Sequence, residues 1–160
     1  MQARRTATNG NRFFKAFAML GRSNSGGAAL ELAVVAPLLF LLVIGAVDYG
    51  RVFFTSITVA NAARAGAEYG AQSVAVSPDT AGMRTFAQGD GQDAGQLAVA
   101  ARQYCKCAGA DHTCSTVCAD GTVPEVYVEV TATKQLAMFL KYPGLADTVT
   151  IVRKATFRSQ

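Results

Sequence analysis

The most apolar stretch of the chain is Leu32 to Val47, sixteen residues without a charged side chain. Extended back through small residues to Gly26, it becomes 22 residues interrupted by one charge, that of Glu31. An α-helix needs about 20 apolar residues to cross the hydrocarbon core of a bilayer. The pattern therefore predicts a transmembrane helix over residues 27–47, and Pro37, which removes a backbone hydrogen bond, predicts a kink within it.

The helical pattern continues beyond this stretch. Between Asp48 and Ser77 there is no strong helix breaker, and Ser77, as the residue ahead of Pro78, is disfavoured in the helical conformation. We therefore expect one helix from Gly27 to about Val76, whose residues 48–76 continue outside the bilayer. Small residues at spacings of three and four along this half let another helix approach closely, although the high helix propensity of alanine alone also accounts for them. These residues are Ala60, Ala63, Ala67, Gly70 and Ala71.

Residues 77–160 have shorter periodic stretches and predict a small head. Residues 77–92 are rich in turn-forming residues and are expected to be a loop. Residues 93–104 have apolar side chains at helical spacing, with Asp93 as the N-cap, and predict a short helix. The side chains on its apolar face are Leu97, Ala100, Ala101 and Tyr104.

Two stretches near the C-terminus alternate between apolar and polar positions. Residues 123–133 and 148–158 each predict a strand with one buried face. We expect the two strands to pair antiparallel across a Pro143-Gly144 turn and to pack against the outer half of the long helix. The inward sets are Val126, Val128, Val130 and Ala132, and Val149, Ile151, Ala155 and Phe157. The predicted fold is α+β, a long N-terminal helix with a small head.

Composition excludes several classes of protein. The chain has the length of one domain, its 51% hydrophobic and 16% charged residues exclude disorder, and four cysteines in 160 residues are too few for a disulfide-rich miniprotein. The net charge of +4 suggests a nucleic-acid partner, but residues 1–30 hold five basic residues and no acid, which leaves −1 for the remainder. Residues 48–160 contain ten basic and ten acidic residues, so a basic nucleic-acid surface is not expected.

The uneven charge also predicts a topology. Basic residues collect on the cytoplasmic side of transmembrane helices. All five basic residues of the first thirty precede the apolar stretch, whereas Asp48 and Arg51 cancel beyond it. Residues 1–26 are therefore expected to be a cytoplasmic basic leader, and residues after about 48 to lie outside the cytoplasm.

Four cysteines cluster in the part that is expected to be outside the cytoplasm: Cys105, Cys107, Cys114 and Cys118. An even number of cysteines in an oxidising compartment predicts two disulfides. A bond between the first two would close a strained, very short loop, which leaves 105–118 with 107–114, or 105–114 with 107–118. A zinc site is the alternative, because His112 lies between the pairs, but the spacing lacks the usual C-x2-C knuckle.

The sequence offers little to build an enzyme. The one histidine lies in the cysteine loop, so there is no Ser-His-acid set, and the acids are scattered. Glu125 and Glu129 are close in sequence but fall on a strand face that we expect to be open to solvent. No glycine-rich phosphate loop follows a strand. We expect a non-enzymatic protein without a cofactor.

The residues around the start of the apolar stretch resemble the type IV prepilin, or class III, signal. A basic leader, Gly26, small residues and then Glu31 precede the apolar run. The resemblance implies an inner-membrane aspartyl peptidase that cuts between Gly26 and Gly27, which makes Glu31 the fifth residue of the mature chain. An ordinary secretory signal is cut after its apolar core and would lose the anchor.

The resemblance also gives Glu31 a role as an assembly carboxylate. A lone carboxylate in a bilayer is costly and usually has a partner. Cleavage creates a free amine on Gly27, one helical turn away, so the partner is that amine or the amine of a neighbouring subunit, and pilins imply the neighbour. The alternative is that Glu31 has no assembly role and lies at the level of the inner headgroups.

Further motifs are similar to the TadE family of minor pseudopilins from tight-adherence (Flp, type IVc) pilus systems, a pattern that TadF and TadG relatives share. The resemblance covers residues 27–71 and extends to the cysteine cluster and closing strands. Its motifs are Asp48-Tyr49-Gly50-Arg51, Asn61-Ala62-Ala63-Arg64 and Tyr127-Val128-Glu129-Val130.

The resemblance implies a minor pseudopilin of the bacterial inner membrane that takes part in assembling an adhesive Flp pilus. The implied partners are pilin and pseudopilin subunits through the N-terminal helix, a prepilin peptidase and the inner-membrane assembly platform. Two alternatives remain open at this point. One is an uncleaved single-pass adhesin or envelope scaffold, and the other is a zinc-binding head.

Overall fold

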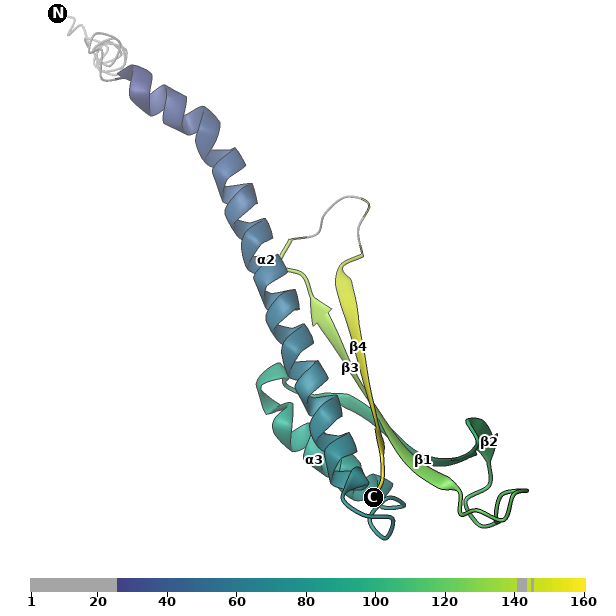
Figure 1. Cartoon of the computed structure of the whole chain (residues 1–160). Helices are drawn as coiled ribbons and strands as arrows, with labels where there is room; N and C mark the ends of the chain where they lie inside the picture. Colours follow the sequence, from purple (N-terminus) through teal and green to yellow (C-terminus); the bar gives the residue numbers. More distant parts are fainter. Residues whose placement is uncertain (1–25, 141–143, 145) are drawn as a thin grey trace, which may run out of the picture. The chain divides into compact units, whose positions relative to one another are not determined.

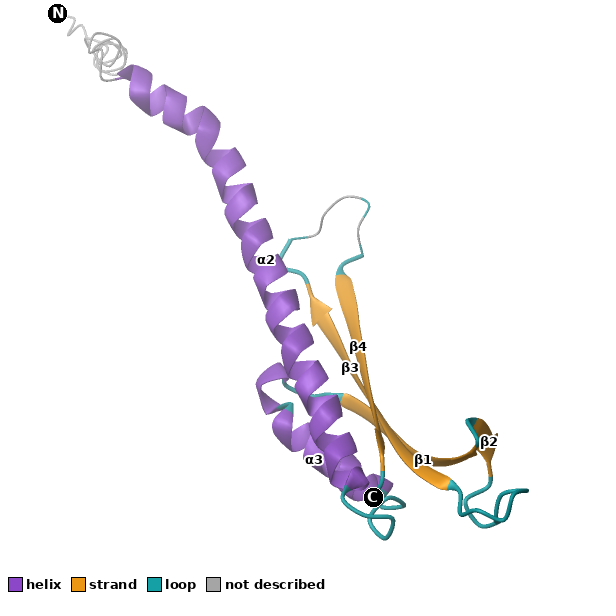
Figure 2. Ribbon diagram, in the orientation of Figure 1, coloured by secondary structure: helices purple, strands orange, loops and turns teal. Residues whose placement is uncertain are grey.

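The computed structural model describes residues 26–140, 144 and 146–160, so the expected leader lies outside the described residues apart from Gly26. These residues form two α-helices, one 3-10 turn and four strands (Figures 1 and 2). The elements are α2 (Gly26–Ala71), α3 (Thr80–Asp90), η1 (Gln92–Ala94), β1 (Ala98–Cys107), β2 (Ala110–His112), β3 (Glu125–Ala137) and β4 (Thr148–Arg158). The predicted α+β class is confirmed.

The chain divides into two compact units between Ile44 and Gly45, within α2. The second unit, residues 45–160, holds the sheet and the core, and we call it the folded unit. The first described unit, residues 26–44, is entirely helical. Helix α2 therefore contributes to both units.

Helix α2 ends at Ala71 rather than near Val76 as expected. Residues 74–78 form a turn, in which Ser77 Oγ donates to the carbonyl of Val74 at 2.8 Å and accepts from Gln103 Nε2 at 2.7 Å. Serine side chains that bond to nearby backbone groups compete with helical hydrogen bonds. The turn before Pro78 thus begins earlier than the proline alone predicts.

The assignments between residues 77 and 104 were wrong. Residues 77–92, expected to be a loop, contain helix α3. Residues 93–104, expected to be a helix, contain part of η1 and most of strand β1.

Helix α3 forms because its first turn is capped and one face is buried. Asp79 Oδ1 accepts the N–H of Gly82 at 2.8 Å, which satisfies a backbone donor at the N-terminus of the helix. Met83 and Ala87, one turn apart, are fully buried. They are the two buried residues of α3. Two apolar positions do not establish a helical repeat, so the sequence does not indicate this helix.

Strand β1 forms because it pairs with a distant strand. Ala101 lies opposite Val130 and Tyr104 opposite Tyr127 in an antiparallel ladder with β3. Alanine-rich sequence with apolar residues at helical spacing fits a helix locally, but cross-strand pairing decides the conformation here.

The four strands form one antiparallel sheet in the order β2-β1-β3-β4 (Figure 2). The predicted pairing of the two C-terminal strands is confirmed, with Val130 opposite Ala155. Strand β3 extends to Ala137, beyond the expected end at residue 133, and Val128, Val130 and Ala132 are buried as the alternation predicted.

The core lies between one face of the sheet and the helices of the folded unit. One cluster joins α2 to β3 and β4, and a second joins α2 and α3 to β3. The buried members of the first are Val59, Ala62, Ala63, Leu97, Ala132 and Ile151, and those of the second are Ala67, Met83, Ala87, Val128 and Val130.

The helix that packs on the small residues of α2 belongs to the same chain. A Cβ atom on Gly66 would lie 2.6 Å from the carbonyl oxygen of Met83 and 2.9 Å from Cβ of Ala87, both in α3. Of the predicted stripe, Ala67 and Gly70 also face α3: Ala67 clusters with Met83 and Ala87, and a Cβ atom on Gly70 would meet the Met83 side chain. Together with Gly66 they permit a close contact between α2 and α3.

Candidate functional site

The predicted cleavage site lies in the first residues of α2. Gly26 and Gly27 are exposed, and no described atom lies within 4 Å of the position that a Cβ atom would take on either glycine, neighbouring residues aside. The space at both Cβ positions is therefore open to a second protein. Cleavage of the bond between the two glycines stays a prediction.

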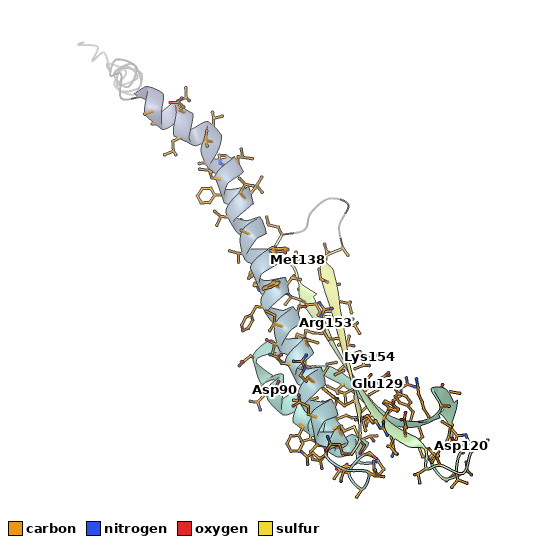
Figure 3. All side chains as sticks on the ribbon, in the orientation of Figure 1. Asp90, Asp120, Glu129, Met138, Arg153 and Lys154 are labelled. Atoms are coloured by element: carbon orange, nitrogen blue, oxygen red, sulfur yellow. A yellow bond between two sulfur atoms is a disulfide. The ribbon has the colours of Figure 1, made fainter. Side chains whose placement is uncertain are left out.

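The part of α2 that follows is apolar and uncovered. Its most apolar 18-residue window contains no buried residue, and it has the length and composition of a membrane-spanning helix. Figure 3 shows side chains on all sides of this part of the helix. Phe40, for example, exposes 67% of its surface. In water such a surface would favour association or insertion.

Glu31 is exposed within this apolar part of α2. It lies four residues after Gly27, one helical turn, so both residues are on the same face of the helix. Leu30, Val34 and Val35 line a shallow hollow with these two residues. The arrangement places a carboxylate within reach of an amine that a cut before Gly27 would create. Pro37 lies inside the helix, which is continuous through it, and the expected kink stays a prediction.

The Asp48-Tyr49-Gly50-Arg51 motif connects α2 to the end of strand β3. The Asp48 side chain is 2% exposed, and its two oxygens accept the backbone N–H of Phe139 at 3.1 and 3.2 Å. Leu140 donates a longer bond of 3.5 Å. The Arg51 guanidinium carbon lies 4.0 Å from the centre of the Phe139 ring, and an Arg51 nitrogen lies 3.6 Å from Asp48.

Asp48 is a buried residue whose hydrogen bonds the sequence does not predict. In the sequence it is only a charge that flanks the membrane segment. A buried carboxylate needs hydrogen-bond donors, and here they come from residues 91 and 92 positions further along the chain. The available signal was a charge placed directly after an apolar run, inside a motif shared with a family.

The Asn61-Ala62-Ala63-Arg64 motif has a packing role. The two alanines are fully buried against the sheet, while Asn61 and Arg64 are exposed. The alanines leave room for the sheet to approach α2. Asn61 and Arg64 do not pack against the sheet, so packing does not restrict the size of their side chains.

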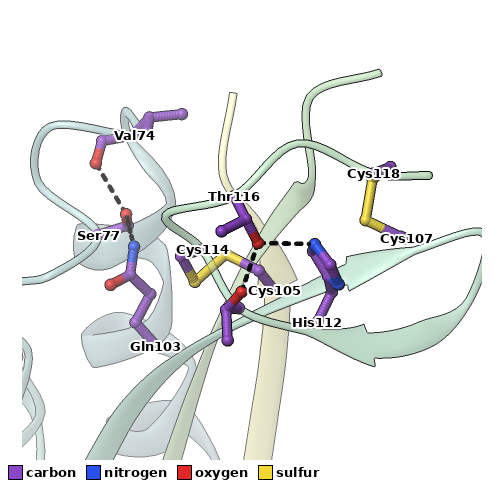
Figure 4. Close-up of a disulfide and its surroundings, with 10 residues drawn as sticks. Val74, Ser77, Gln103, Cys105, Cys107, His112, Cys114, Thr116 and Cys118 are labelled. Atoms are coloured by element: carbon purple, nitrogen blue, oxygen red, sulfur yellow. Dashed lines mark hydrogen bonds between the residues drawn. A yellow bond between two sulfur atoms is a disulfide. The ribbon is translucent and has the colours of Figure 1, made fainter. Parts of the chain in front are cut away.

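The four cysteines form two disulfides, Cys105–Cys114 and Cys107–Cys118 (Figure 4). This is one of the two pairings that the spacing allowed. All four sulfurs are used, and among the described residues no group of three or more histidine, cysteine or acidic side chains could hold a metal ion. His112 Nε2 instead lies 3.0 Å from the Thr116 hydroxyl. The cysteines thus do not form the zinc site that was the alternative.

The outer face of the sheet carries an ion-pair network rather than an acid–base site. Glu129 accepts from Arg102 at 2.8 Å and from Lys154 at 3.0 Å, and Glu125 pairs with Arg158 at 2.8 Å. Figure 3 labels Glu129 and Lys154. The hydrogen bond from Arg102 is the main cause of a lowered pKa of the Glu129 carboxyl. A carboxylate held ionised in this way is not suited to proton transfer near neutral pH.

A surface hollow of about 830 Å3 lies between α3 and the strands, with Gln88 and Gln96 in its wall. Lys134 is the one ionisable side chain among its lining residues, and its Nζ donates to the carbonyl of Gln96 at 3.1 Å. This hollow offers no pair of groups for catalysis. The expectation of a non-enzymatic protein stays a prediction.

A long helix with an apolar, uncovered N-terminal part, followed by a small second helix, a disulfide-linked loop and an antiparallel sheet, is the layout of pilin-like proteins. Residues 26–68 match the family model of TadE-like protein, which confirms the resemblance indicated by the motifs. The match begins at the predicted cleavage site and includes Glu31, the Asp48 motif and the Asn61 motif. Comparisons with curated proteins and with solved structures find no match.

Proposed function

We propose that this chain is a minor pseudopilin that takes part in assembling an adhesive Flp, or type IVc, pilus. In this proposal a prepilin peptidase removes residues 1–26, and the mature chain stays in the bacterial inner membrane through residues 27–47. The C-terminal residues then lie outside the cytoplasm. Other pilin and pseudopilin subunits and the inner-membrane assembly platform are its partners.

One observation carries the proposal: a TadE-like match over a helix whose apolar part has no cover among the described residues and holds a single carboxylate. An uncovered apolar helix needs lipid or other apolar helices around it. A carboxylate at Glu31 is then costly unless an amine or water is near. A pilin-like assembly supplies both, because subunits pack through such helices and each brings a new N-terminal amine.

The proposed orientation has two independent supports. Five basic residues lie on the leader side of the apolar stretch, which favours a cytoplasmic N-terminus. The two disulfides lie on the other side of it, and disulfides persist in compartments outside the cytoplasm.

The processing step is tested by N-terminal sequencing of the membrane-bound protein, expressed with and without a prepilin peptidase. We expect a mature chain of 134 residues that starts at Gly27 when the peptidase is present, and the full chain of 160 residues without it. A chain that still starts at Met1 beside an active peptidase contradicts processing and favours the uncleaved adhesin or scaffold.

The assembly role of Glu31 is tested by Glu31→Gln, with Glu68→Gln as the matched control. Both glutamates are exposed on α2, but Glu68 lies in the folded unit. We expect Glu31→Gln to be cut normally and to lose about tenfold in incorporation into pilus fractions, equivalent to about 1.4 kcal/mol in subunit association. Glu68→Gln should be incorporated as the parent chain is. Equal incorporation of both variants contradicts the role of Glu31.

A further inference from the structure

The folded unit has a set of exposed aromatic side chains directly after the apolar stretch. Tyr49, Phe53 and Phe54 of α2 expose 74%, 60% and 60% of their surface, and Phe139 at the end of β3 exposes 63%. Soluble surfaces seldom gather large apolar side chains in this way without a partner. The position of these residues along the chain indicates which partner covers them.

Chain continuity fixes the level of these residues relative to the end of the apolar stretch. Helix α2 is continuous from Val47 onward, and at about 1.5 Å per residue Tyr49 lies about 3 Å and Phe53 about 9 Å beyond Val47. Each headgroup layer of a bilayer is about 5–8 Å thick. Tyr49 therefore falls inside this layer and Phe53 just beyond it.

Asp48 brings a second segment to the same level. Its buried carboxylate accepts the N–H groups of Phe139 and Leu140, so the end of β3 lies beside the helix turn that follows Val47. The Arg51 guanidinium lies over one face of the Phe139 ring. Phe139 is thus held at the level of Tyr49 although it is 90 residues away in sequence.

We infer that Phe139 and Leu140 dock, together with Tyr49 and Arg51, into the headgroup layer of the bilayer that α2 crosses. The partner is a lipid surface. Tyrosine and tryptophan rings concentrate at this level of a membrane, and an arginine at this level lies near the lipid phosphate groups. A protein neighbour could also cover the rings, but the level of these residues is set by the apolar stretch of the same chain. The inference rests on the proposed membrane span of residues 27–47.

The docking makes Asp48 a positioning residue. It touches no lipid in this arrangement, because its oxygens are buried under the end of β3. The hydrogen bonds from Phe139 and Leu140 replace the hydration that a carboxylate would otherwise keep at the membrane surface. Loss of these bonds should release the end of β3 from the bilayer and leave the span in place.

The test uses the absence of tryptophan from the chain. We would introduce one tryptophan per variant, as Phe139→Trp, Phe40→Trp or Val123→Trp, into the full chain. Each variant would be reconstituted into phosphatidylcholine vesicles, at low protein density, with and without bromine on the acyl chains near the headgroups or deeper. Phe40 lies in the apolar stretch, whereas Val123 is 80% exposed in the loop after the disulfides.

We expect shallow bromine to quench F139W, deep bromine to quench F40W, and neither to quench V123W. If F40W is quenched while F139W behaves as V123W does, the docking is overturned and the membrane span stands. A blue-shifted F139W without quenching means that protein covers the ring, which also overturns the docking. If F40W is not quenched, the span fails and the docking fails with it.

The positioning role of Asp48 is tested in the same vesicles. Asp48→Ala should shift the emission of F139W to the red and reduce its quenching, while the quenching of F40W stays unchanged. Asp90→Ala, at an exposed end of α3, is the matched control and should change neither signal. Undiminished quenching of F139W with Asp48→Ala contradicts the role of Asp48.

Discussion

Gly66 shows how one residue sets the contact between the two helices. A methyl group there would lie 2.6 Å from the carbonyl oxygen of Met83 and 2.9 Å from Cβ of Ala87. Because the first of these neighbours is backbone, α3 as a whole would have to move. The lack of a side chain at this position is therefore a packing requirement of the fold.

We predict that Gly66→Ala lowers the free energy of unfolding by about 1–2 kcal/mol, because overpacking outweighs the better helix propensity of alanine. Gly50→Ala is the matched control in the same helix, since nothing lies within 4 Å of its Cβ position. Thermal unfolding in detergent, followed by near-ultraviolet circular dichroism, would measure both. A Gly66→Ala chain as stable as the Gly50→Ala chain contradicts the close contact.

Glu129 makes part of the stability depend on pH. Its pKa is lowered chiefly by the hydrogen bond from Arg102, with a further contribution from Lys154. A lowered pKa in the folded state means that ionised Glu129 stabilises the fold above the ordinary glutamate value of 4.5. This stabilisation is lost as pH falls through the lowered pKa.

We predict that Glu129→Gln lowers the free energy of unfolding by about 0.5–1 kcal/mol at pH 7, a modest value because both cationic partners are largely exposed. The difference from the parent chain should vanish in acid, below the lowered pKa. Denaturant unfolding at several pH values would measure it, with Glu68→Gln as the control. A difference that is independent of pH would assign the effect to packing instead.

Some features of individual residues could be predicted from the sequence and others could not. Gly26, Gly27 and Glu31 are exposed on α2, and the cleavage and assembly roles assigned to them stay predictions. The burial of Asp48 could not be predicted, because its donors at Phe139 and Leu140 belong to another element. Local sequence contains the charge but not the distant N–H groups that stabilise it.

At the scale of elements, long and regular patterns predicted what the structure contains. The apolar run gave α2, and strict alternation gave β3 and β4 with their inward residues. Helix α3 and strand β1 were assigned wrongly, because α3 buries only two residues and β1 is rich in alanine. Tertiary pairing decides such short or ambiguous stretches.

The two disulfides connect strand β1 to the loop that follows β2. The spacing of the cysteines left two pairings open, and the structure has Cys105 with Cys114 and Cys107 with Cys118. Neighbouring side chains of a strand point to opposite faces, but Cys105 and Cys107 are two residues apart and share one face. Either could reach the loop, so spacing alone cannot decide.

We predict that Cys118→Ser frees the thiol of Cys107 and that Cys114→Ser frees the thiol of Cys105. Trypsin cuts after Lys106 and separates the two, so alkylation before reduction, followed by mass spectrometry, identifies the free thiol in each variant. The crossed pairing would give the reverse labels. Alkylation of the parent chain without reductant should find no free thiol.

At the scale of the whole molecule, α2 has two kinds of surface. Up to Val47 its side chains are uncovered and, apart from Glu31, apolar, and from Val59 to Gly70 it supplies part of the core of the folded unit. The TadE-like match covers the first stretch and most of the second. The sequence could predict that α2 has an apolar part and a part that packs in the core. The first is an uninterrupted apolar run, and the second has small residues at helical spacing.

The packing of α3 on α2 limits how copies of the chain can meet. Gly66, Ala67 and Gly70, small residues near the C-terminal end of α2, are already covered within each chain. The side chains that this end of α2 leaves exposed are larger, among them Arg64 and Glu68. Helices that meet through such side chains keep their axes about 8–10 Å apart. The internal contact between α2 and α3 therefore sets a minimum spacing wherever this end of α2 lies beside the same end of a second copy.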